Sequence, residues 1–171
     1  MLSENLTKAL SNQINAEYYS AYLYLIMSAA AEGLGLKGTA NWLFVQSQEE
    51  MSHGTHIYDY IIARGATPAF KEIKKPPTDY TDIREIFELV HAHELVITKS
   101  INSIATEAMK ELDHACYQFM LWYVNEQVEE ESKSMEILDK LRMIGDEKGM
   151  MLALDNDLST RVFENPFAES A

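Results

Sequence analysis

The chain has 171 residues and a formal net charge of −13, and 47% of its residues are hydrophobic. This length suits a single domain, which we expect to cover residues 1–171. The acidic balance excludes the basic footprint that direct nucleic-acid binding needs, and it disfavours contact with anionic membranes. No apolar run reaches the roughly 18 to 20 residues of a membrane span.

The cysteine content and the N-terminus predict a compartment. The first residues, MLSENLTKALSNQ, have neither the basic head nor the apolar body of a signal peptide. One cysteine, Cys116, allows no internal disulfide, so the reducing cytoplasm is the expected location. Cys116 itself is expected to be a small buried hydrophobic residue.

Glycine and proline residues cluster in the chain and separate segments with helical periodicity. Gly33, Gly65 and Gly145 are expected to stop helices, and Asp113 is expected to cap the start of one. The predicted helices cover residues 3–33, 38–64, 81–111 and 113–145, with a shorter helix at 149–160.

The lengths of the connections predict the topology. Short connections after 3–33 and after 81–111 favour two antiparallel hairpins. The segment 65–81 can span about 55 to 60 Å when extended, which exceeds the length of about 40 Å expected for the helix at 38–64. We therefore predict an all-α protein, a four-helix bundle with one long crossover and a short C-terminal fifth helix.

Each of the four long helices carries an apolar stripe at 3-4 spacing that polar residues interrupt near its middle. The interrupting residues, in chain order, are Glu17, then Glu50 with His53, then Glu94, then Gln127 with Glu130. They lie at similar distances from the ends of their helices. Packing of the bundle should therefore bring them to one level in the core.

Several carboxylates in one core need positive charge nearby. Burying one unpaired carboxylate costs several kcal/mol, and like charges raise each other's pKa. No Lys or Arg occupies the central stripe positions, so bound metal cations are the simplest solution. Glu50 and His53 share one helix face and can bind the same ion. Oxygen ligands with one imidazole and no thiolate suit iron or manganese, with zinc able to compete.

Four stretches, NAEYYSAYLYL, QSQEEMSH, AHELV and WYVNEQVEEE, resemble the bacterial non-haem ferritins of the ferritin-like di-iron family. The fourth helix has Gln127-Val128-Glu129-Glu130 where bacterioferritins and rubrerythrins carry a second Glu-x-x-His. The chain also lacks the Cys-x-x-Cys pairs of a rubrerythrin. The resemblance implies an iron-storage ferroxidase: it would oxidise Fe(II) with dioxygen or hydrogen peroxide and keep the ferric mineral inside a hollow homo-oligomeric shell of about 24 subunits.

The resemblance also implies a di-iron centre. Glu17, Glu50 and His53 would hold the first iron. Glu50 would bridge to the second, which Glu94 and Glu130 would complete.

A further site and a further ligand follow from the same resemblance. Gln127 would lie beside the second iron. Glu49, Glu126 and Glu129, together with Glu130, match the third iron site of bacterial ferritins.

Tyr24 lies two helical turns beyond Glu17 on the same face. In the family the matching tyrosine hydrogen-bonds a carboxylate of the site. Electron donation by Tyr24 is one alternative for this chain, and a core tyrosine with any hydroxyl partner is the other. Met51 resembles the haem-binding methionine of bacterioferritins, but such a methionine also occurs in haem-free ferritins, and no haem is expected.

Three other classes remain open on the residues alone. A di-iron oxygenase or peroxidase could use the same centre with a substrate pocket beside it. A Dps-like DNA-protecting protein would keep its ligands at a dimer interface and would normally lack the fifth helix. A helical scaffold without catalysis would need the mid-stripe carboxylates to face solvent.

Overall fold

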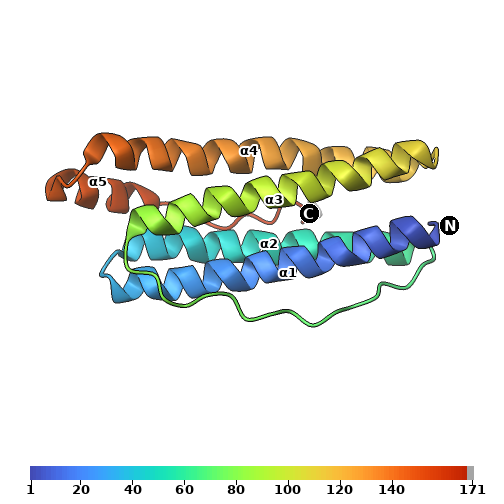
Figure 1. Ribbon diagram of the computed structural model, residues 1–171, viewed down its shortest axis with the longest axis horizontal. Helices are drawn as coiled ribbons and strands as arrows, with labels where there is room; N and C mark the ends of the chain where they lie inside the picture. Colours follow the sequence, from blue (N-terminus) through green and yellow to red (C-terminus); the bar gives the residue numbers. More distant parts are fainter. Residues whose placement is uncertain (169–171) are drawn as a thin grey trace.

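The computed structural model describes residues 1–168, and within them all regular structure is helical (Figure 1). The helices are α1 (Glu4–Gly33), α2 (Lys37–Ala63), α3 (Ile83–Lys110), α4 (His114–Ile144) and α5 (Lys148–Leu158). Each boundary lies within two residues of its predicted position. The predicted four-helix bundle with a short fifth helix is confirmed.

The crossover between α2 and α3 runs along the whole bundle beside α1, so that α2 and α3 are parallel (Figure 1). Hydrogen bonds hold this segment to α1. The Ala69 N–H donates to Ser11 Oγ at 3.0 Å, and the Lys71 N–H donates to Asn15 Oδ1 at 3.0 Å. The long connection is therefore a fixed strap, and the topology predicted from its length is confirmed.

The helix ends follow ordinary capping chemistry. The Asp113 carboxylate accepts a hydrogen bond from the Cys116 N–H at 2.9 Å, as its predicted N-cap role requires. The backbone at Gly65 and Gly145 has φ of +73° and +55°, which suits glycine at these stops. Helix α1 ends at Gly33 as predicted, but the left-handed residue of its turn is Gly35, with φ of +79°.

Helix α5 packs against the start of α2 through one buried carboxylate, that of Asp155. Its oxygens accept hydrogen bonds from the Gly38 N–H at 3.0 Å, and from the Thr39 N–H and Oγ1 at 2.8 Å each. The residue before α2, Leu36, makes no side-chain cap of its own. Asp155 thus supplies from α5 the cap that α2 lacks.

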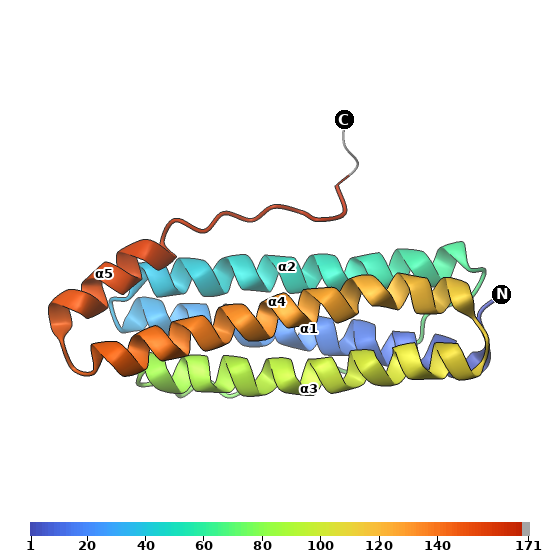
Figure 2. The same ribbon diagram turned by 90° about the horizontal axis from the view of Figure 1, so that it is seen from above.

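Glycine is required at position 38 by this close approach. A Cβ on Gly38 would lie 1.6 Å from the Asp155 carbonyl oxygen. The C-terminal segment after α5, residues 159–168, then turns back alongside α2 (Figure 2). The Asn41 side-chain amide donates to the carbonyl oxygens of Ser159 and Arg161 at 3.3 and 2.9 Å and holds this segment in place.

Two apolar clusters form the core, one toward each end of the bundle. The first includes Met27, Leu43, Phe87, Val90 and Leu141. The second includes Leu6, Leu10, Ile57, Ile101 and Met120, and Cys116 is buried there as expected. Within the described chain, no helix combines the length and the apolar character that crossing a bilayer requires. The buried polar residues lie between the two clusters.

We expect the substitution Asp155→Ala to lower the free energy of unfolding by about 2 to 4 kcal/mol, because three buried donors lose their acceptor. Release of α5 should also expose the segment after Ile144 to limited proteolysis. The matched control is Asp157→Ala, at an exposed position of the same helix. Equal stability and equal cleavage of the two variants would show that Asp155 does not hold α5 in place.

Candidate metal centre

The six residues that interrupt the predicted stripes are all buried in the middle of the bundle, each between 1% and 5% exposed. They come from all four long helices: Glu17 from α1, Glu50 and His53 from α2, Glu94 from α3, Gln127 and Glu130 from α4. The expectation that these positions reach one level in the core is correct. A scaffold with solvent-facing carboxylates is excluded.

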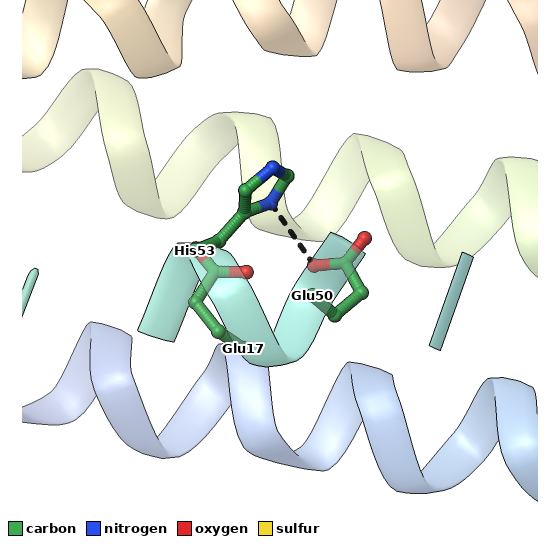
Figure 3. A group of neighbouring side chains, drawn as sticks. All are labelled: Glu17, Glu50 and His53. Carbon is green, nitrogen blue, oxygen red and sulfur yellow. Dashed lines mark ion pairs between the residues drawn. The ribbon is translucent and has the colours of Figure 1, made fainter. Parts of the chain in front are cut away.

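One half of this layer is a compact group of metal-ligand atoms formed by Glu17, Glu50 and His53. One ligand atom from each side chain lies within 4.8 Å of the other two. The Nδ1 atom of His53 is 3.5 Å from Glu50 Oε2, and the Glu17 carboxylate faces both across the space between α1 and α2 (Figure 3). Among residues 1–168, no other group of three or more His, Cys, Asp or Glu side chains brings its ligand atoms this close together.

The other half centres on Glu94 and Glu130. The Tyr24 hydroxyl donates to Glu94 Oε1, and the Gln127 amide donates to Glu94 Oε2 at 3.1 Å. The two halves are joined by Gln46, whose amide donates to Glu130 Oε2 at 2.7 Å and to Glu50 Oε1 at 3.2 Å.

Two glutamines of this layer, Gln13 and Gln46, were missing from the predicted site. The Gln13 amide donates to Glu17 Oε1 at 2.8 Å, as Gln46 does to Glu50. Each glutamine is buried and lies four residues before its glutamate on the inward face. That repeated Gln-x-x-x-Glu spacing is the signal that could have identified them.

The side chains matched to a third iron site lie at the edge of the layer. Glu49 and Glu126 are half-buried, and Glu129 is exposed. Glu49 is ion-paired with Arg161, and the Lys133 ammonium lies 3.7 Å from Glu129 Oε2. Within the described residues, these carboxylates form no group whose ligand atoms lie as close together as those of Glu17, Glu50 and His53.

A family model described as a ferritin-like domain matches residues 7–144. The chain belongs to the ferritin family. Among curated proteins it is 39% identical over 158 residues to a "Probable bacterial non-heme ferritin-like protein" of Haemophilus influenzae, covering 92% of this chain and 96% of that protein. It is 37% identical over 164 residues to the "Bacterial non-heme ferritin" of Staphylococcus haemolyticus, covering 96% and 99% of the two chains.

Solved structures of ferritins have the same fold. An engineered closed form of the Archaeoglobus fulgidus ferritin superposes with a TM-score of 0.94 at 43% identity, covering 96% of this chain and 100% of that one. An open pore ferritin from the same archaeon gives a TM-score of 0.92 at 44% identity, covering 94% and 98%.

Three of the buried carboxylates, those of Glu17, Glu50 and Glu94, have raised pKa values, which favours their protonated form. Burial is the main cause that raises the pKa values of Glu17 and Glu50, and repulsion from a neighbouring carboxylate adds to it. Burial, and then the charge of Glu130, raises the pKa of Glu94 to about 7, although hydrogen bonds from Tyr24 and Gln127 oppose the shift.

One carboxylate oxygen marks where a cation would bind. Glu17 Oε2 is buried and has no hydrogen-bond partner within the described chain. A buried acceptor without a partner costs about 1 to 3 kcal/mol. Since the Glu17 side chain belongs to the compact group with Glu50 and His53, a metal ion bound by that group could satisfy this oxygen. The donor set fits a hard, oxygen-preferring cation with one nitrogen ligand.

We expect the metal-free protein to lose stability as the pH rises from about 4.5 through about 7. In that window folded Glu94 keeps a proton that the unfolded chain has released, so unfolding becomes more favourable with pH. The measurement is the unfolding temperature of the metal-free protein at pH 5.5 and 7.5. The substitution Glu94→Gln should reduce the fall between them, whereas Glu88→Gln, at an exposed position of α3, should not. Equal falls in both variants would contradict the assignment.

Proposed function

We propose that this ferritin stores iron by oxidising Fe(II) to Fe(III) at the buried carboxylate centre and keeping the product as a mineral inside a hollow shell of identical subunits. The observation that carries the proposal is the convergence of Glu17, Glu50 and His53, buried and with Glu17 Oε2 unsatisfied within the described residues. The relatives named bacterial non-heme ferritin support iron as the metal and the absence of haem.

In this proposal the centre binds two Fe(II) ions as substrates. Glu17, Glu50 and His53 bind the first, and Glu50, Glu94 and Glu130 bind the second. Glu50 is suited to bridge, because its Oε2 faces His53 while its Oε1 accepts from the same Gln46 amide that holds Glu130.

The reaction takes one electron from each Fe(II). Two electrons and two protons convert one dioxygen to hydrogen peroxide, and two further Fe(II) ions with two more protons reduce that peroxide to two waters. Carboxylates favour the product because hard anionic oxygens stabilise Fe(III) more than Fe(II). A ligand set with a single imidazole, that of His53, still permits release of Fe(III) to the mineral.

Several side chains prepare the carboxylates for this task. The Tyr24 hydroxyl and the Gln127 amide hold the two oxygens of Glu94, and Gln13 holds one oxygen of Glu17. The ligands are thereby oriented before metal arrives, which lowers the cost of ordering them. We assign Tyr24 this positioning role; electron donation by Tyr24 stays a prediction.

Storage needs an enclosed space that a single bundle does not have. The likeness to ferritins described as an open pore form and an engineered closed form supports a homo-oligomer, and we propose a shell of about 24 subunits with closed symmetry. The net charge of −13 per chain would surround the cavity with negative charge and favour cation entry. The cytoplasm is the proposed location.

Two alternatives are less well supported. A Dps-like protein would place its ligands at a dimer interface, whereas here the proposed ligands come from the four long helices of one chain. A di-iron oxygenase would use the same metals but would leave no mineral, so mineral formation distinguishes the two functions.

We expect Glu94→Ala to slow Fe(II) oxidation at least ~10-fold, because the second iron loses a ligand. The rate is measured by the absorbance of Fe(III) after Fe(II) is mixed with the metal-free protein in air. Glu88→Ala, an exposed glutamate on the same helix, is the matched control and should keep the wild-type rate. An unchanged rate in Glu94→Ala would exclude this residue as an iron ligand.

We also expect the metal-free protein to sediment as a large shell that becomes denser and rust-coloured after repeated additions of Fe(II) in air. The measurement is sedimentation velocity with detection of iron in the fastest boundary. A small species that leaves iron in solution would contradict the storage function even if the Fe(II) were oxidised.

A further inference from the structure

Lys133, on α4, lies at the edge of the inner layer, which consists of Glu17, Glu50, His53, Glu94, Gln127 and Glu130. Its ammonium lies 3.4 Å from Glu130 Oε1 and 3.7 Å from Glu129 Oε2. The other oxygen of Glu130 accepts from Gln46 inside the bundle. The two oxygens of Glu130 therefore have separate partners, an amide on the inner side and an ammonium on the outer side.

A second cation, Arg161, reaches the same edge from the C-terminal segment after α5. Its guanidinium is ion-paired with Glu49 and lies 4.4 Å from the centre of the Trp42 ring. It also donates to the Trp42 carbonyl oxygen at 3.4 Å, while the Arg161 carbonyl oxygen accepts from Asn41. The side chains of Arg161 and Glu49 are only 15% and 17% exposed, so this pair is a fixed part of the fold.

These cations contact three of the four carboxylates that the sequence predicts for a third iron site. Glu49 has Arg161, and Glu129 and Glu130 share Lys133. By contrast, Glu17, Glu50 and Glu94 have no ion pair with a lysine or arginine in residues 1–168. In residues 1–168, Glu17, Glu50 and Glu94 therefore have no lysine or arginine partner, whereas Glu49, Glu129 and one oxygen of Glu130 have one.

We propose that Lys133 and Arg161 are built-in counter-ions that take the place of a third iron, so that each subunit binds two metal ions in the inner layer and none at Glu49, Glu126 and Glu129. A divalent cation bound by Glu49, Glu126 and Glu129 would have to displace the Lys133 ammonium and the Arg161 guanidinium, or lie against these positive charges. Displacing Arg161 would also break its contacts with Trp42. This inference rests on the proposed function of the inner pair.

The test is the number of Zn(II) ions bound per subunit, measured by calorimetry and by metal analysis after gel filtration of the metal-free shell. Zn(II) is the probe because it binds such ligands and does not change oxidation state. We expect Glu126→Ala/Glu129→Ala to leave the wild-type number unchanged. We expect Lys133→Leu/Arg161→Leu to bind one additional ion per subunit.

A combined variant identifies where the added ion binds. Introducing Glu126→Ala and Glu129→Ala into the Lys133→Leu/Arg161→Leu protein should remove the additional ion. Lys110→Leu is the matched control, because Lys110 is an exposed lysine paired with Glu107 on α3, and it should bind no extra Zn(II).

Two results would overturn the inference. One is the loss of an ion when Glu126→Ala/Glu129→Ala is made in the otherwise wild-type protein, a comparison that does not depend on the folding of the leucine variants. The other is no gain in a folded Lys133→Leu/Arg161→Leu shell. A different result would contradict the proposed function, namely that Glu94→Ala, made in the wild-type protein, binds as many Zn(II) ions as the wild type.

Discussion

The burial of four carboxylates within one layer is the constraint on which the rest of this structure depends. Each of Glu17, Glu50, Glu94 and Glu130 is at most 3% exposed, and an unpaired buried carboxylate costs several kcal/mol. The fold compensates in part with neutral donors, namely the amides of glutamines and the hydroxyl of Tyr24. Burial nevertheless raises the pKa values of Glu17, Glu50 and Glu94, so these neutral donors offset only part of its cost.

The surrounding bundle keeps these carboxylates from escaping to solvent. An apolar cluster closes the layer at each end, the long crossover is hydrogen-bonded along α1, and α5 caps the start of α2. The edge of the layer follows a different rule, because Lys133 and Arg161 supply positive charge from the chain itself. In the described residues, Glu49, Glu129 and one oxygen of Glu130 thus have a lysine or arginine partner, whereas Glu17, Glu50 and Glu94 have none.

The sequence was sufficient to predict the inner layer because its signal is periodic. Glu50 and His53 share a helix face by spacing alone, and short hairpin connections set the depths of Glu17 and Glu94. The role of Gln46 could not be predicted in the same way, since its reach to Glu130, 84 residues away, depends on how the helices pack. Arg161 lies in a segment without helical periodicity, and its contact with Glu49 joins residues 112 positions apart.

The most direct test of the central claim is anomalous X-ray scattering at the iron edge from crystals of the metal-free protein loaded with Fe(II) without oxygen. If the buried carboxylates exist to bind metal, two neighbouring iron peaks will appear in each subunit. One will lie among Glu17, Glu50 and His53, and the other among Glu50, Glu94 and Glu130. Iron bound only at the outer surface, with the inner layer free of metal, would contradict the account.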